Sequence, residues 1–83
     1  MTLEELVAGL NEILVEQFEI DPGLLHPEAR LREDLELDSL DAVDLVVAIE
    51  KKFGCRIKEA DARQMRILRD ISDYIQQWAH ATT

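Results

Sequence analysis

Ser39 is the residue of this 83-residue chain whose type and position are best suited to covalent chemistry. It stands between Asp38 and Leu40, where a polar, acidic segment gives way to apolar residues at helical spacing. Asp38 or Ser39 can cap the N-terminus of a helix, and Asp41 adds negative charge to the first turn, where the helix dipole favours it. We therefore expect the Ser39 hydroxyl to be exposed at the positive end of a helix, a position suited to a covalently bound phosphate.

Ser39 lacks the sequence neighbours of a catalytic serine. An activated serine needs a positioned base and an oxyanion hole. The groups nearest in sequence, Asp38 and Asp41, are carboxylates without an intervening imidazole, and the Gly-x-Ser-x-Gly turn is absent. We predict that the protein is not an enzyme, and that a separate enzyme must activate the Ser39 hydroxyl.

The alternating acids Asp34, Glu36 and Asp38 resemble the start of a calcium-binding EF-hand loop. In that alignment the sixth position is Ser39 where the loop requires glycine, and the twelfth is Leu45 where it requires glutamate. Both requirements fail. The sequence therefore predicts no metal site, although weak surface binding of divalent ions to the acids is compatible with it.

Charge is unevenly distributed along the chain. Residues 1–50 hold 14 acids against two arginines, a formal −12, whereas residues 51–83 hold four acids and seven bases, a formal +3. The acidic half argues against nucleic acid and anionic membranes as partners and favours basic protein surfaces. The single cysteine excludes an internal disulfide and, with no membrane-length apolar run, predicts a cytoplasmic protein.

Apolar periodicity predicts an all-α fold. Thr2 and Glu5 form a capping-box pattern before a helix that extends to about Phe18. Further helices are expected over residues 39–53, 59–65 and 67–78, with fraying from Ala79. The expected product is a small four-helix bundle with three main helices and one short helix. The leucines expected to pin the long connection after the first helix to the bundle are Leu24, Leu25, Leu31, Leu35 and Leu37.

The helix that begins at Ser39 carries two apolar stripes. One, with Leu45, Ile49 and Phe53, is expected to face the core. The other comprises Leu40, Val43 and Val47 and is interleaved with acids, namely Asp41, Asp44 and Glu50. A single helix in so small a domain cannot bury both stripes, so the second is predicted to be an exposed strip that binds partner proteins. The alternative is a helix buried nearly all round.

These features together resemble the acyl carrier protein family. The resemblance rests on Asp38-Ser39-Leu40, on the acidic apolar helix that continues to Glu50, on Phe53-Gly54, and on the closing run from Asp70 to Ile75. It implies one acyl carrier domain over residues 1–83, with 4′-phosphopantetheine attached to Ser39 beside Asp38. It also implies that the exposed strip docks partner enzymes: a phosphopantetheinyl transferase, a ketosynthase and an acyltransferase. A monomer is the simplest expectation for such a shuttle.

The family resemblance further implies that an acyl chain slips between the helices. The residues that would line its space, by position, are Leu45, Val46, Ile49, Ile57, Met65, Leu68 and Ile71. From the residues alone, each of these is equally a plain core residue.

The chain departs from ordinary fatty-acid carriers before its last helix. Those carriers tend to hold acids and a small Thr-Val pair there, whereas this chain has Arg63, Arg66, Arg69 and Ile67. A specialised polyketide or lipid pathway is therefore open beside fatty-acid synthesis. Two alternatives remain: an aminoacyl or peptidyl carrier, although the Leu-Gly-Gly-x-Ser signature is missing, and an unmodified acidic helical adaptor.

Overall fold

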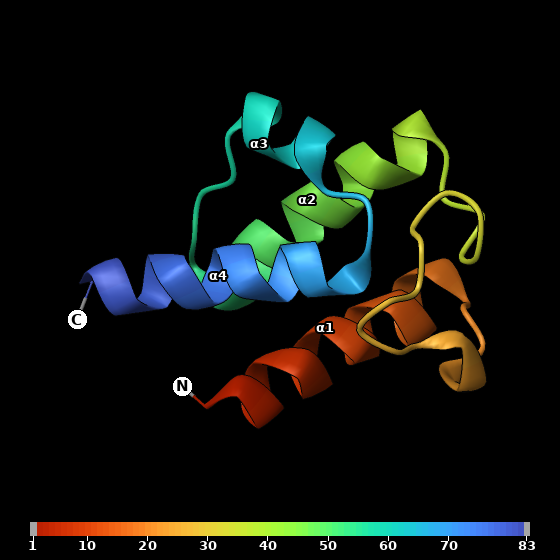
Figure 1. The fold of residues 1–83 in the computed structure, drawn as a ribbon, viewed down its shortest axis with the longest axis horizontal. Coiled ribbons are helices and arrows are strands. Elements are labelled where there is room, and N and C mark those ends of the chain that lie inside the picture. The colour runs from red at the N-terminus through yellow and green to blue at the C-terminus, as the bar shows by residue number, and fades with distance from the viewer. Residues whose placement is uncertain (1, 83) are drawn as a thin grey trace.

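The protein folds as a bundle of helices in the computed structural model, which describes residues 2–82 and the side chains of residues 2–78 (Figure 1). The elements in order are α1 (Leu3–Phe18), the 3₁₀ turn η1 (Pro22–Leu24), α2 (Ser39–Phe53), α3 (Glu59–Gln64) and α4 (Leu68–Thr82). The predicted all-α class is confirmed, with three long helices and one short helix.

Three helix boundaries differ from the sequence-based expectation, and the first is the end of α3, at Gln64 instead of Met65. The fourth helix begins at Leu68, because Ile67 is drawn into an isolated antiparallel bridge with Arg30. It then continues to Thr82, beyond the expected end at Trp78, and Thr83 lies outside the described residues. The fraying predicted from Ala79 stays a prediction.

Capping boxes fix the starts of α1 and α2: the sequence predicted the one at Thr2, and of the two possible caps for α2 the structure has Asp38. Thr2 Oγ1 accepts a hydrogen bond from the Glu5 N–H at 3.1 Å, and Asp38 Oδ1 accepts one from the Asp41 N–H at 2.9 Å. In each box the later carboxylate also accepts from the N–H of the capping residue. Gly54, with φ of 68°, ends α2 in the left-handed conformation that favours glycine.

Helix α1 is the element against which both α2 and α4 pack. Its fully buried leucines, Leu6, Leu10 and Leu14, join Ile49, Ile71 and Ile75 at the centre of the core. Gly9 allows the close approach of α2, because a Cβ there would lie 3.0 Å from Phe53 Cζ and 3.1 Å from Lys52 Cε.

The long connection between α1 and α2 is folded down onto the bundle. Leu35 and Leu37 are buried, and Leu25 and Leu31 pack against the core. Leu24 is 46% exposed, so its prediction as an anchoring residue is wrong. Leu24 ends the η1 turn, which Asp21 caps by accepting the Gly23 N–H. The apolar residues near this turn that contribute to the core are Ile20, before it, and Leu25, after it.

Backbone hydrogen bonds tie this connection to the segment between α3 and α4. The Leu31 N–H donates to the Arg66 carbonyl at 2.9 Å, and the Leu68 N–H donates to the Ala29 carbonyl at 3.1 Å. The Leu37 N–H in turn donates to the Leu31 carbonyl at 3.0 Å, just before α2 begins. Two segments distant in sequence, residues 29–37 and 66–68, are thereby joined next to the start of α2.

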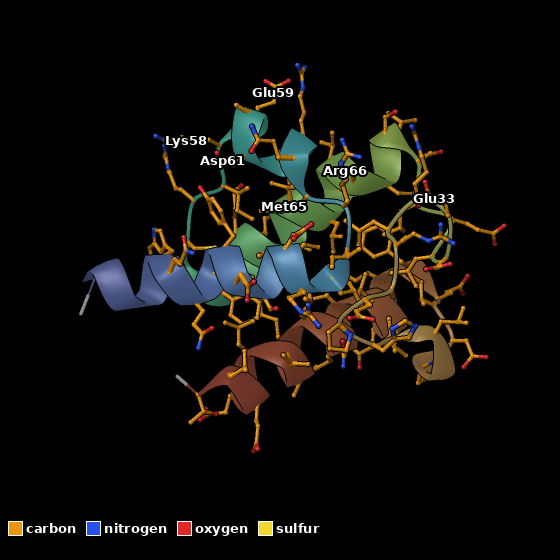
Figure 2. The ribbon with its side chains drawn as sticks, viewed as in Figure 1. Glu33, Lys58, Glu59, Asp61, Met65 and Arg66 are labelled. Carbon is orange, nitrogen blue, oxygen red and sulfur yellow. The ribbon has the colours of Figure 1, made fainter. Side chains whose placement is uncertain are left out.

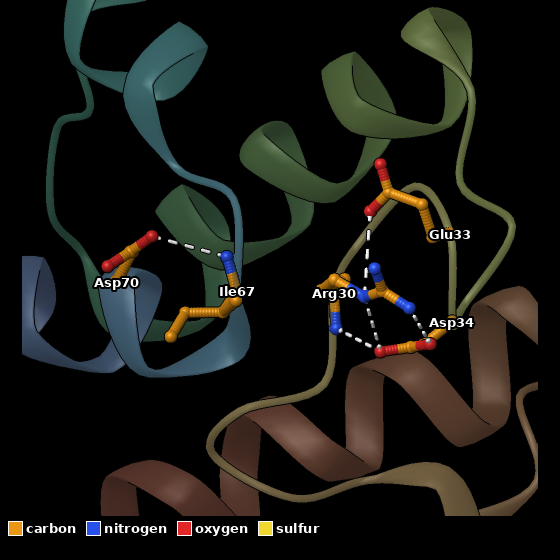
Figure 3. A network of polar contacts seen from close by, with 5 residues as sticks. All are labelled: Arg30, Glu33, Asp34, Ile67 and Asp70. Carbon is orange, nitrogen blue, oxygen red and sulfur yellow. Dashed lines mark hydrogen bonds and ion pairs between the residues drawn. The ribbon is translucent and has the colours of Figure 1, made fainter.

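Side chains reinforce both sides of this junction (Figure 3). Asp34 Oδ2 accepts the Arg30 N–H at 2.8 Å, while the Arg30 guanidinium lies 3.3 Å from the other carboxylate oxygen. These contacts hold the pKa of Asp34 below its usual value. Across the junction, Asp70 Oδ2 accepts the N–H groups of Arg66 and Ile67, at 2.9 and 3.2 Å.

Candidate functional site

Ser39 is the first residue of α2 and its side chain is exposed. Its hydroxyl makes no hydrogen bond to any other described residue. The Asp38 carboxylate beside it is engaged as the helix cap by the Asp41 N–H and is directed to the backbone. The site therefore offers an open hydroxyl held in place by a rigid first helical turn.

Two backbone donors at this helix start are unused. The N–H groups of Asp41 and Ala42 are bonded to Asp38, through its side chain and its carbonyl. Those of Ser39 and Leu40 have no acceptor among the described residues. Free N–H groups at the positive end of a helix dipole favour an anion. A phosphate on the Ser39 oxygen fits this environment, since it would lie in solvent next to two free donors.

The second apolar stripe of α2 is exposed. Leu40, Val43 and Val47 are 76%, 61% and 44% exposed, with Asp44 exposed among them. Glu50 is different, because its carboxylate accepts the Ile57 N–H at 2.9 Å and so fastens the connector after α2. The predicted exposure of the second stripe is therefore confirmed, and the alternative of a helix buried nearly all round is wrong.

Comparison with known proteins decides the family. Residues 8–75, which include Ser39, match the family described as the phosphopantetheine attachment site. The chain is 36% identical over 75 residues to an acyl carrier protein of Thermosynechococcus vestitus, covering 90% of this chain and 93% of the relative. It is 40% identical over 76 residues to acyl carrier protein 2 of Ralstonia nicotianae, covering 92% and 94%. The chain belongs to the acyl carrier protein family.

A third relative broadens the range of pathways within the family. The meromycolate extension acyl carrier protein of Mycolicibacterium smegmatis is 40% identical over 76 residues, covering 92% of this chain and 77% of the relative. Membership gives this chain an acyl carrier role in work with biosynthetic enzymes, and 4′-phosphopantetheine as its cofactor.

The residues expected to line an acyl space in this carrier lie together in the core. Leu45, Ile49, Ile57, Leu68 and Ile71 are each no more than 8% exposed. Val46 and Met65 are partly buried and pack against the same cluster. A surface hollow between α1 and α2 is lined by residues outside this set, among them Ile13, Phe18 and Val47. In this structure the seven residues are packed core.

One contact near these residues was not foreseen from the sequence. The Tyr74 hydroxyl on α4 donates to Asp61 Oδ2 on α3 at 2.9 Å. Burial, together with this hydrogen bond to a carboxylate, raises the pKa of Tyr74. The two residues are 13 positions apart and on different helices, so neither periodicity nor capping rules point to the pair.

Within the described residues, no three His, Cys, Asp or Glu side chains gather closely enough to hold a metal ion. Among the helices described, none is both long and apolar enough to span a membrane.

Proposed function

We propose that Ser39 is the residue that carries the phosphopantetheine arm, and that the chain presents acyl thioesters on it to fatty-acid or polyketide-type biosynthetic enzymes. The observation that carries this proposal is the exposed, unbonded Ser39 hydroxyl at a helix start with two free N–H donors. Asp38 serves the site by capping the turn that positions Ser39.

Attachment requires a separate phosphopantetheinyl transferase (holo-carrier synthase). The Ser39 oxygen forms a bond to the phosphorus that bears pantetheine in coenzyme A. The diphosphate bond breaks, adenosine 3′,5′-bisphosphate leaves, and the hydroxyl proton passes to a base on the transferase. This chain supplies the oxygen, its orientation, and the free N–H groups of Ser39 and Leu40 next to the resulting anion.

The docking surface for partner enzymes is the α2 strip of Leu40, Val43 and Val47 with Asp41 and Asp44. A basic surface on the partner complements these acids, and the exposed valines and leucine supply apolar contact. The fit suits the transferase, a ketosynthase and an acyltransferase. Glu50 contributes at the far end of the strip by holding the connector to α3 in place.

The acyl chain is proposed to enter among the seven core residues Leu45, Val46, Ile49, Ile57, Met65, Leu68 and Ile71. They are aliphatic or thioether side chains contributed by α2, α4 and the segments around α3. The further expectations of one domain over residues 1–83, a monomer, no catalytic activity of its own and a cytoplasmic location stay predictions.

Intact-protein mass spectrometry tests the attachment. The protein is incubated with coenzyme A, Mg²⁺ and a broad-specificity phosphopantetheinyl transferase, beside Ser39→Ala and Ser72→Ala. Ser72 is the matched control because it is the only other serine, and its buried hydroxyl donates to the Arg69 carbonyl. We expect one phosphopantetheine on the wild type and on Ser72→Ala, and none on Ser39→Ala.

Other results would contradict the proposal in different ways. A gain of mass on Ser39→Ala would move the attachment to another residue. No gain on any variant would favour the unmodified acidic adaptor, which predicts normal function after Ser39→Ala.

A further inference from the structure

A phosphate at Ser39 would enter a strongly negative neighbourhood. Asp38, Asp41 and Asp44 all lie within the first two turns of α2, and no cationic side chain lies within ion-pair distance of any of them among the described residues. Each of these carboxylates repels the phosphodiester that joins the arm. The partial charge of the helix start offsets only part of this repulsion. A nearby cation would lower the electrostatic free energy of a phosphodiester at this position.

Most cations of the chain are paired or distant from this site. Arg30, Lys52, Arg63 and Arg69 form ion pairs with Asp34, Glu12, Glu59 and Glu28. Lys51 lies about 18 Å from Ser39 at the rise of an α-helix, and Arg56 and Lys58 belong to the connector after α2. Within residues 2–78, the unpaired cations that remain are Arg32 and Arg66.

The backbone of Arg66 is fixed close to the start of α2. Its carbonyl accepts the Leu31 N–H, and the Leu31 carbonyl accepts the N–H of Leu37, two residues before Ser39. Its own N–H is held by Asp70. The side chain is exposed, and Figure 2 shows that it projects from the segment between α3 and α4. Arg32, by contrast, stands in an acidic stretch that contains Glu33, Asp34 and Glu36.

We propose that Arg66 is a positioning residue whose guanidinium pairs with the phosphodiester at Ser39 and offsets the repulsion of the neighbouring carboxylates. Guanidinium matches the geometry of phosphate oxygens and can bind two of them at once. Arg66 holds the base of the arm on the α3 side of the site and leaves the α2 strip free for partners. This inference rests on the attachment of the arm to Ser39.

The test compares the apo and holo forms of each variant at low ionic strength. Melting temperatures are measured for the wild type, Arg66→Gln and Arg56→Gln. Arg56 is the matched control, because it is also exposed and unpaired and its replacement changes the net charge equally. We expect Arg66→Gln to lower the melting temperature of the holo form by about 2–4 °C more than that of the apo form. Arg56→Gln should shift both forms alike.

A second readout reports on the phosphate itself. The ³¹P chemical shift of the phosphodiester should move on Arg66→Gln, be largely restored in Arg66→Lys, and stay unchanged in Arg56→Gln. The extra loss in melting temperature should vanish in ~1 M salt, where the Debye length is about 3 Å. A merely structural role for Arg66 would lower both forms equally and leave the phosphorus signal in place.

Two results would overturn the proposal. One is an equal change in the melting temperatures of the apo and holo forms in Arg66→Gln, and the other is an extra loss in the holo form of Arg32→Gln instead. Failure of the proposed function itself is seen separately, because mass spectrometry would then show no arm on the wild type.

Discussion

At Ser39, neighbouring side chains act on the helix and on the attached phosphate in opposite directions. Asp38 and Asp41 stabilise the start of α2, since each carboxylate accepts a backbone N–H there. The same two carboxylates are an unfavourable environment for a second anion. The residue that carries the arm thus stands at a well-defined helix start, and the charge balance around it depends on other elements.

Backbone conformation sets the ends of the helices on either side of the long connection. Glu19 ends α1 with φ of 55° and Gly54 ends α2 with φ of 68°, both in the left-handed region. Glutamate is strained there and glycine is not. Nothing lies within 4 Å of a Cβ placed on Gly54, so the effect of a substitution there comes from the backbone alone.

Exchanging these residue types should change stability with opposite signs. We expect Gly54→Ala to destabilise the protein by roughly 1 kcal/mol and Glu19→Gly to stabilise it by up to about 1 kcal/mol. Denaturant unfolding followed by circular dichroism measures both. A loss of stability in Glu19→Gly would show that the Glu19 side chain contributes more than its strained backbone costs.

Among the helices, α3 is the least anchored. It has six residues, none of them buried, and its N-cap Lys58 makes no side-chain cap. Asp61 connects it to α4 through the Tyr74 hydroxyl, while Ala62 and Met65 pack against the core. Because Met65, the C-cap of α3, is one of the proposed acyl-lining residues, the weak anchoring of α3 bears on how a chain enters.

Removing the hydroxyl in Tyr74→Phe should loosen α3 selectively. We expect amide hydrogen exchange over residues 62–65 to become faster, because the free energy of local opening falls by about 0.5–1.5 kcal/mol. Exchange in α1 should stay unchanged. Equal acceleration in both helices would mean that the substitution destabilises the whole fold.

The pH dependence supplies an independent check on the Tyr74 variant. Because the pKa of Tyr74 is raised in the folded state, the unfolded chain loses its phenol proton first. Stability should therefore fall as pH rises above the ordinary tyrosine value of about 10 and until the folded pKa is passed. This part of the decline should be absent in Tyr74→Phe.

At this scale, contacts between residues close in sequence could be predicted, and contacts between residues distant in sequence could not. Both capping boxes join residues three positions apart; the Thr2 box was read correctly from residue types, and for α2 the cap was narrowed to Asp38 or Ser39. The bonds from Ile57 to Glu50, from Tyr74 to Asp61 and from Arg69 to Glu28 span 7, 13 and 41 positions. They depend on how the elements pack, which periodicity alone does not specify. The same holds for Leu24, whose residue type favoured burial.

For the molecule as a whole, the feature that bears most on binding an acyl chain is the aliphatic composition of the core. The six most completely buried large side chains are all leucine or isoleucine. The partly buried aromatic residues Phe18, Phe53, Tyr74 and Trp78 lie around this centre. The side chains of an aliphatic centre can replace contacts with one another by contacts with an acyl chain, because both kinds of contact are between alkyl groups.

Loading a medium-length acyl chain should therefore raise the melting temperature. Each methylene removed from water contributes about 0.8 kcal/mol at most, less the cost of separating packed side chains. Differential scanning calorimetry on holo protein carrying chains of increasing length measures the effect, with the unloaded holo form as the control. A series without any shift would argue that the chain stays outside the bundle.

The backbone junction next to the start of α2 also has a consequence for the order of biosynthetic events. It joins residues 29–31 to residues 66–68, so it cannot form before most of the chain has been synthesised. On a translating ribosome the Ser39 segment emerges well before its structural support does. Modification by a transferase that recognises the folded helix start would then wait until residues 66–68 have left the ribosome, and a shorter nascent polypeptide would be protected from premature loading.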